Sequence, residues 1–214
     1  MFTCENCGAK FDVRQEVLDR YPGWVPPKCM NCRETRPPAR REAPTARRGS
    51  SASRSRDLSI AEVLERFTDG PTTGVFTDGA AEGNPGPGGW GAVMVVDDEV
   101  VAEERGQEAH TTNNKMELTA MVAGLRMIAP DQGIDVYTDS RLVVDTLTKW
   151  AAGWEQRGWR RKTGPIANLE LVKEAYRLSR ERPGARIKWI AAHSGYRWNE
   201  YADALATAYR RATP

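Results

Sequence analysis

The stretch that decides the fold is GVFTDGAAEGNPGPGGWGAVMVV, residues 74–96. An apolar, β-branched run ends in Asp78, a segment with little side-chain bulk follows, and a second apolar run closes the stretch. Two such runs around a segment rich in Gly and Pro predict two strands joined by a turn. The letters GPGGWG at 86–91 match a dinucleotide-binding fingerprint, but that fingerprint must open a helix. Because WGAVMVV continues as a strand, we expect no nucleotide loop here.

Further strands and helices follow this pair along the chain. The first three strands are joined by short turns, which predicts an antiparallel meander, and the later strands alternate with helices, which predicts parallel neighbours. We therefore expect an α/β domain with a mixed five-stranded sheet, three strands antiparallel and two parallel, flanked by helices. The expected strands are 73–78, 90–97, 100–107, 134–138 and 185–191, and the expected helices are 113–129, 140–149, 166–182 and 199–212, with a Trp-rich helical stretch at 150–162.

The composition is that of a globular protein outside the membrane. Of the 214 residues, 40% are hydrophobic and 28% are charged. No apolar run approaches the roughly 20 residues that a membrane helix needs, and the start MFTCENCGAKF lacks the basic and apolar regions of a secretory signal. We expect a cytoplasmic protein with reduced thiols and no membrane partner.

Two short segments precede the main domain. All four cysteines lie in two C-x-x-C pairs, Cys4 with Cys7 and Cys29 with Cys32, a spacing typical of a zinc ribbon with one structural Zn²⁺. Two disulfides or four unrelated thiols are the alternatives. Residues 33–56 then carry eight Arg against two Glu without apolar periodicity, which indicates a flexible linker or a polybasic arm for a phosphate backbone. We expect a zinc-ribbon-like module at 1–34, a basic linker at 35–57 and a globular domain at 58–214.

Carboxylates recur at positions where a core would exclude them. VFTD ends the first strand at Asp78, and VYTD ends the fourth at Asp139. If these strands are parallel neighbours, both acids lie at one rim, where like charges repel unless a cation separates them. Glu117 and Asp203 each stand among apolar residues of a helix, so each must be paired or bound to metal. A helix cap is the alternative for Asp139, and His193 near this rim suits proton transfer.

Five segments together resemble type 1 ribonuclease H over about residues 73–213. They are TDGAAEGNPGPGGWG, TTNNKMEL, YTDS, WEQRGW and HSGYRWNEYADALA. The resemblance implies the ribonuclease H-like fold and hydrolysis of the RNA strand of an RNA/DNA hybrid, leaving 5′-phosphate and 3′-hydroxyl ends. It further implies that two Mg²⁺ or Mn²⁺ ions are held by four carboxylates and that His193 assists proton transfer. The implied metal ligands are Asp78, Glu117, Asp139 and Asp203.

The resemblance also implies a substrate surface. Asn84, Asn113 and Asn114 match positions that read the minor groove, where 2′-hydroxyls are exposed. Thr112 and Asn168 match a pocket for a DNA-strand phosphate. In the basic, Trp-rich stretch KWAAGWEQRGWRRK, residues 149–162, we expect Trp150 to contact DNA and Trp154 to pack against the core.

Two positions depart from the family pattern. His110 stands where an Arg is frequent, and Arg141 replaces a polar amide after the TDS aspartate. The alternatives to this enzyme are a hybrid-binding module without catalysis and another nuclease or transposase of the same fold. We expect a monomer whose N-terminal module adds nucleic-acid or protein contacts.

Overall fold

The computed structural model describes residues 2–4, 7–12, 15 and 58–211. The chain divides into two compact units, residues 1–54 and 55–214. Cys29, Cys32 and the basic segment predicted at 35–57 lie outside the described residues.

The N-terminal unit contains a small hairpin around the first cysteine pair. Strand β1 (Phe2–Thr3) pairs with β2 (Lys10–Phe11) in antiparallel register. Between them the Cys4 carbonyl accepts a hydrogen bond from the Gly8 N–H at 2.9 Å, and Gly8 has a φ of +71°. Cys4 is buried and Cys7 is exposed. A glycine with positive φ thus closes the turn directly after the C-x-x-C pair.

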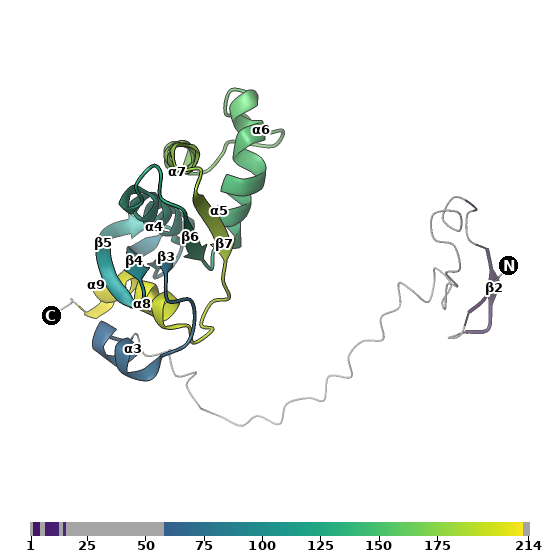
Figure 1. Cartoon of the computed structure of the whole chain (residues 1–214). Helices are drawn as coiled ribbons and strands as arrows, with labels where there is room; N and C mark the ends of the chain where they lie inside the picture. The colour runs from purple at the N-terminus through teal and green to yellow at the C-terminus, as the bar shows by residue number, and fades with distance from the viewer. Residues whose placement is uncertain (1, 5–6, 13–14, 16–57, 212–214) are drawn as a thin grey trace. The chain divides into compact units, whose positions relative to one another are not determined.

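The larger unit is built on a mixed five-stranded sheet with the order β5-β4-β3-β6-β7. Strands β3 (Gly74–Ala81), β4 (Gly86–Val96) and β5 (Glu99–Thr111) form the antiparallel meander. Strands β6 (Ile134–Thr138) and β7 (Ala185–Trp189) continue the sheet in parallel from β3 (Figure 1). The predicted mixed five-stranded sheet of an α/β domain and the predicted strand directions are confirmed for this unit.

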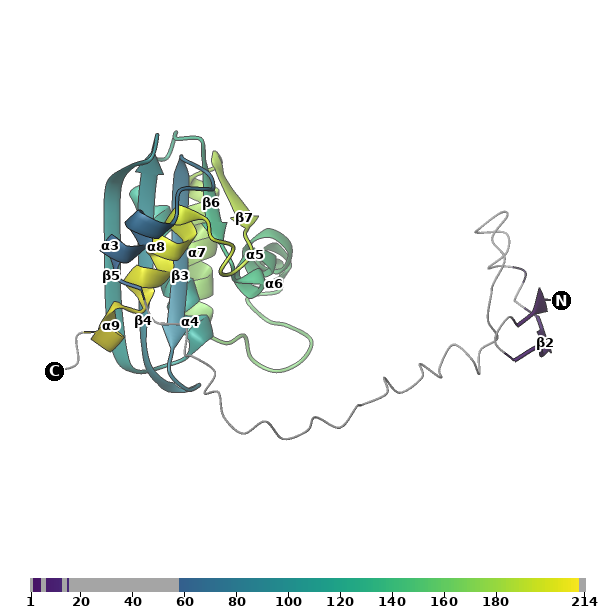
Figure 2. The same ribbon diagram turned by 90° about the horizontal axis from the view of Figure 1, so that it is seen from below.

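Helices cover both faces of this sheet (Figure 2). On one face α4 (Asn113–Met127) and α7 (Leu169–Glu181) bury a cluster that includes Val75 and Val136. On the other face, α3 (Ile60–Arg66) and α8 (Arg197–Ala206) bury a cluster that includes Phe76 and Val93. The short helix α9 (Ala208–Arg211) follows α8. Val75 and Phe76 are neighbours that face opposite layers, as the pleat of a strand requires. No helix within the described ranges is long and apolar enough to span a bilayer.

The Gly-rich segment differs from its prediction. The connection between β3 and β4 comprises residues 82–85, and GPGGWG forms the first half of β4 instead of a turn. A Cβ added at Gly91 would lie 2.4 Å from the Leu205 Cβ and 2.8 Å from the Ala202 carbonyl oxygen. The absent side chain therefore lets α8 cross β4 closely, and this packing requirement explains the glycine.

The helices after β6 are more broken than predicted. The region expected as one helix at 140–149 and a helical stretch at 150–162 consists of α5 (Arg141–Asp145), a π-helical turn η1 (Thr146–Trp150) and α6 (Ala151–Gln156). The Thr148 hydroxyl donates to the Val144 carbonyl at 2.7 Å, a bond that competes with the regular ladder. Helix α7 begins at Leu169, not at 166, because Asn168 has a left-handed φ of +52°.

Candidate active site

Two aspartates lie side by side where the pairing of β3 with β6 stops, although β3 itself continues past its predicted end at Asp78 to Ala81. Strands β3 and β6 are parallel and pair with Thr77 opposite Thr138. The residue that follows each threonine is an aspartate, Asp78 on β3 and Asp139 after β6, so the two aspartates are neighbours. The Thr77 hydroxyl donates to the Tyr137 carbonyl at 3.3 Å and ties the strands together just before this point. Ser140, not Asp139, caps α5, because its hydroxyl accepts from the Val143 N–H. The capping alternative for Asp139 is therefore wrong.

Glu117 reaches the same rim from α4. A Cβ added at Gly79 would lie 2.2 Å from the Glu117 backbone nitrogen, so Gly79 lets the first turns of α4 lie directly against β3. One carboxylate oxygen of Glu117 accepts a hydrogen bond from the Asn113 amide at 2.6 Å. Within the described residues, the other oxygen, Oε2, is buried without a hydrogen-bond partner. A buried acceptor of this kind is costly unless a ligand satisfies it.

Helix α8 and the loop before it bring a third group of side chains to the rim. His193, Glu200 and Asp203 each offer a ligand atom, and these atoms lie within 4.8 Å of one another. His193 is exposed, with its Nδ1 3.9 Å from the Glu200 Oε2. Glu200 is 7% exposed, and its Oε1 accepts from the Gly195 N–H at 3.2 Å.

Glu200 was not among the site residues predicted from the sequence. A signal was present, because Glu200 stands three residues before Asp203 in a stretch with Trp198 and Tyr201, and side chains three apart share one helix face.

The electrostatics show that these carboxylates are held together against their repulsion. Burial, followed by the charges of Asp139, Asp203 and Glu117, raises the pKa of Asp78 well above its usual range. Burial and the Asp139 charge raise the pKa of Glu117 to about 8. The pKa of Asp139 is also raised, first by burial and then by Asp203, whereas His193 lowers it. Crowded acids of this kind favour either protons or a cation.

The donor set fits a hard divalent cation. Its ligand atoms are carboxylate oxygens, which Mg²⁺ and Mn²⁺ prefer, and the unpartnered Glu117 oxygen is an acceptor that a cation could satisfy. Asp78, Glu117, Asp139 and Asp203 are the residues that could hold such ions.

Two of the three predicted minor-groove readers adjoin this rim. The Asn84 side-chain oxygen accepts from the Asn113 N–H at 3.3 Å, and the Asn113 side chain in turn donates to Glu117. Asn84 lies in the turn before β4, and Asn113 opens α4. This chain of contacts joins two of the three amides to a carboxylate of the site.

Three of the remaining predicted substrate residues, Asn114, Trp150 and Asn168, gather at a second place. Asn114, Trp150, Trp154 and Asn168 line one pocket of about 280 Å³, together with Arg161. Thr112 does not line it, but its hydroxyl caps α4 by accepting from the Lys115 N–H. Trp150 is 39% exposed, whereas Trp154 packs against the core cluster, so the expected packing role of Trp154 is confirmed.

The two departures from the family pattern have different surroundings. His110 is exposed near the end of β5. The Arg141 guanidinium lies 3.7 Å from the centre of the Trp189 ring, and the Trp189 indole N–H donates to the Asp139 carbonyl at 2.9 Å. Arg141 therefore stacks on a side chain that steadies the backbone of Asp139.

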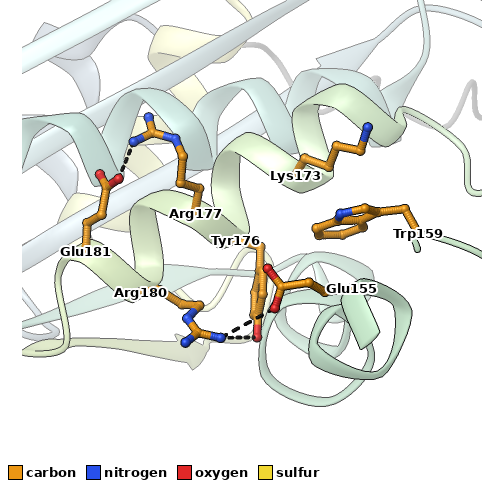
Figure 3. A pocket seen from close by; sticks show the side chains of 7 residues that line it. All are labelled: Glu155, Trp159, Lys173, Tyr176, Arg177, Arg180 and Glu181. Carbon is orange, nitrogen blue, oxygen red and sulfur yellow. Dashed lines mark hydrogen bonds and ion pairs between the residues drawn. The ribbon is translucent and has the colours of Figure 1, made fainter. Parts of the chain in front are cut away.

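A hollow of about 550 Å³ between α6 and α7 lies apart from this chemistry (Figure 3). Four of its five charged groups pair with each other, since Arg180 contacts Glu155 at 3.5 Å and Arg177 contacts Glu181, and Arg180 also lies 3.4 Å from the Tyr176 hydroxyl. None of the four predicted metal ligands lines it. Although this hollow is large, it is therefore not the candidate active site.

Comparison with known proteins assigns the larger unit to a protein family. A family model described as RNase H matches residues 71–211. The Ribonuclease H of Agrobacterium fabrum is 45% identical over 133 residues, which are 62% of this chain and 90% of that protein. The Ribonuclease H of Rhizobium meliloti is 46% identical over 135 residues, 62% of this chain and 86% of that protein. Among solved structures, LC9-RNase H1, a type 1 RNase H with the type 2 active-site motif, has 33% identity and a TM-score of 0.54, covering 66% of this chain and 74% of that one.

The fold and the carboxylate rim thus define a ribonuclease H-like protein. Because the family model covers well over half of the chain, the chain belongs to the RNase H family and is a hydrolytic nuclease. Family and fold support cleavage of the RNA strand of RNA/DNA hybrids, and the family uses divalent metal ions such as Mg²⁺. The assignment as an enzyme is confirmed over the alternative of a binding module without catalysis.

Proposed function

We propose that the chain is an endoribonuclease that hydrolyses the RNA strand of RNA/DNA hybrids by a two-metal mechanism, giving 5′-phosphate and 3′-hydroxyl ends. The observation that carries this proposal is the register of β3 and β6, which aligns Asp78 with Asp139 beside the buried oxygen of Glu117 that has no hydrogen-bond partner in the described part of the chain. Asp203 completes the proposed ligand set from α8. When bound, two Mg²⁺ or Mn²⁺ ions supply an activated water and charge stabilisation at the leaving oxygen.

The chain's own groups prepare this reaction. Asn113 orients the Glu117 carboxylate through its amide, which leaves the second oxygen free for a ligand. His193 is exposed beside Glu200 and Asp203, so its imidazole can move a proton between solvent and the reacting groups. A pocket of about 480 Å³, lined in part by these three residues, gives the substrate access to them.

The substrate surface follows from the same placement. Asn84, Asn113 and Asn114 would contact the minor groove, where amides can donate to and accept from 2′-hydroxyls. Thr112 and Asn168 would hold a phosphate of the DNA strand. The exposed ring of Trp150 lies in the pocket with Asn168 and would contact the DNA strand as well.

The N-terminal part supplies a second set of proposed contacts. Cys4, Cys7, Cys29 and Cys32 would bind one structural Zn²⁺, and the turn that Gly8 closes after Cys7 is supporting geometry for the first pair. The basic linker would bind the phosphate backbone of nucleic acid. It joins the catalytic domain at Leu58, which lines the same pocket as His193 and Asp203. We expect a cytoplasmic monomer with a ribbon at 1–34 and a linker at 35–57.

A labelled RNA/DNA hybrid tests the proposed function. The wild-type chain with Mg²⁺ or Mn²⁺ should cut the RNA strand internally, and analysis of the ends should find 5′-phosphate and 3′-hydroxyl groups. Asp139→Asn should lower kcat by at least about 100-fold, because a metal ligand supplies several kcal/mol of charge stabilisation. Asp131→Asn, which changes an exposed aspartate after α4, is the matched control and should leave cleavage unchanged. An uncut hybrid would reject the enzyme assignment, and cleavage by Asp139→Asn at the control rate would reject the site.

A further inference from the structure

A short lead-in precedes the part of the chain that matches the family. The match begins at residue 71, whereas α3 and the residues after it span 60–70. The Ser59 hydroxyl accepts from the Glu62 N–H, and the Glu62 carboxylate accepts from the Ser59 N–H at 2.9 Å, so the helix has a complete capping box. Val63 is 1% exposed and belongs to the core cluster with Phe76 and Trp198. The lead-in is therefore an integral part of the catalytic unit, and it lies alongside α8 in both views (Figures 1 and 2).

The residues that follow α3, 67–70, support the loop that carries His193. We call residues 67–70 the brace. The Arg197 Nε donates to the Phe67 carbonyl at 2.7 Å, and the Arg197 backbone N–H donates to the Asp69 carbonyl at 2.8 Å. Asp69 also forms a parallel β-bridge with Tyr196. The Arg197 side-chain bond and this bridge, to which the Arg197 N–H bond belongs, thus fix the end of the 190–196 loop to the brace.

Packing between the brace and the loop is close. Gly70 has a φ of +112°, and a Cβ there would lie 2.8 Å from the Tyr196 Cβ. A Cβ added at Gly195 would lie 3.8 Å from the Phe67 ring. The brace therefore sets the path of the loop over Gly195 and Tyr196, two and three residues after His193.

The rest of the loop has less support. Residues 191–194 are exposed, and His193 has a left-handed φ of +49°. A residue other than glycine keeps this conformation only where its surroundings impose it. The adjoining support comes from Glu200, which accepts from the Gly195 N–H, and from the brace. Phe67 and Arg66 line the pocket of about 480 Å³ that also contains His193 and Asp203.

We propose that the brace is a positioning element for His193, so that a segment outside the family match completes the active site of this chain. The proposal rests on the proposed function, in which His193 moves a proton. Arg197 is the positioning residue that couples the two segments, because its side chain and its backbone both bond to the brace. Removing the Arg197 side chain should misplace the imidazole while leaving the carboxylates in place.

A double-mutant cycle in the full 214-residue chain tests this coupling. Arg197→Ala should lower kcat for hybrid cleavage by about 10-fold with KM little changed, within the loss of up to about 100-fold that a 1 Å misplacement can cause. In a His193→Ala background the same substitution should lower kcat by less than about twofold, since coupled residues are not additive. Arg126→Ala, which removes an exposed arginine paired with Glu174 on α4 and α7, is the control for charge and should have no effect in either background.

Phe67→Ala provides a second route if Arg197→Ala does not fold. It removes the ring beside Gly195, and its control is Leu64→Ala, which truncates an exposed apolar residue of α3. Phe67→Ala should again lower kcat only where His193 is present. Equal losses in both backgrounds, no loss in the wild-type background, or cleavage that does not depend on His193 would each overturn the proposal. A wild-type chain that cuts no hybrid would instead reject the proposed function itself.

Discussion

Gly79 sets the distance between two acids of the candidate site. It lies directly after Asp78 on β3, and the backbone nitrogen of Glu117 occupies the space that its side chain would need. Because Glu117 follows the start of α4 by a single turn, any displacement of that turn also moves the Glu117 carboxylate. A single hydrogen atom in place of a methyl group therefore keeps the carboxylates of Asp78 and Glu117, from two different elements, close together.

Gly79→Ala should consequently damage both stability and activity. A Cβ 2.2 Å from a backbone atom forces α4 away from β3, and overpacking of this kind costs about 1–3 kcal/mol. We expect a lower midpoint in urea and a loss of hybrid cleavage larger than the stability change explains. Gly133→Ala is the matched control, since nothing lies within 4 Å of an added Cβ there. Equal behaviour of the two variants would contradict the argument.

Individual carboxylates were predictable to different degrees. Asp78 and Asp139 were placed by a repeated strand ending, and β3 and β6 do pair in that register. Glu200 was not predicted, because its role depends on its contact with Gly195 and its distance to His193. Both are set by the 190–196 loop, whose path depends on residues 67–70. A pattern within one element can show that a charge is buried, but it does not show which segment folds onto it.

At the scale of elements, the broken helix after β6 separates two tryptophans into different roles. Trp150 ends the π-helical turn η1 and is 39% exposed, whereas Trp154 in α6 packs on the core cluster with Val172 and Tyr176. Their rings are 5.9 Å apart, so they are close neighbours in different environments.

Alanine substitutions should separate these two roles. Trp150→Ala should weaken hybrid binding by about 1–3 kcal/mol, the range for lost stacking on an aromatic ring, with an unchanged Tm. Trp154→Ala should lower the free energy of unfolding, by less than the roughly 3–5 kcal/mol of a fully buried aromatic. Binding measured without divalent metal, where the proposed reaction cannot proceed, and thermal unfolding give the two readouts. A drop in Tm for Trp150→Ala with intact binding would reverse the assignment.

Element types were more predictable than element boundaries. Alternating apolar runs and helical stripes gave the order of strands and helices, because the core enforces both periods. The π-helical turn and the left-handed Asn168 arise from local hydrogen bonding and backbone geometry, which have no apolar period. Similarly, the glycines of β4 indicate a turn in the sequence, whereas the role of Gly89 and Gly91 is to admit α8.

At the scale of the whole molecule, charge is divided unevenly along the chain. Residues 33–56 carry eight Arg and two Glu, a charge of +6, whereas residues 57–214 carry 19 Lys and Arg against 23 Asp and Glu, a charge of −4. A catalytic domain with a negative balance gains little nonspecific attraction to a polyanion. The basic segment is therefore the main source of such attraction that the sequence offers.

Truncation to residues 57–214 should leave kcat intact but weaken hybrid binding. The logarithm of the binding constant falls with the logarithm of the salt concentration, and each arginine that contacts a phosphate adds about 0.9 to the steepness of this fall. Truncation should therefore make the slope less steep by at least about 2. A full-length variant with the eight arginines of 33–56 changed to Gln separates the linker from the cysteine module. If the truncated chain keeps the full salt slope, the N-terminal part serves something other than nucleic-acid binding.

The crowded carboxylates should also make the stability of the metal-free protein depend on pH. Folding raises the pKa of Glu117 from 4.5 to about 8, so between these pH values the folded carboxyl holds a proton that the unfolded chain has released. The folded state then binds more protons, and stability must fall as pH rises through this window. The raised pKa values of Asp78 and Asp139 act in the same direction.

Magnesium should remove most of this dependence, because an ion bound only by the folded state stabilises it and replaces the protons. Thermal unfolding in EDTA should show a Tm that decreases from pH 5 to pH 8, by about 2–4 °C for each kcal/mol lost. With Mg²⁺ in excess the decrease should be smaller. Glu117→Gln, which cannot ionise, should flatten the profile in EDTA. A Tm that rises over this window in EDTA, or that falls as steeply with Mg²⁺ as without it, would show that these carboxylates are not held together as the ligands of a shared metal site.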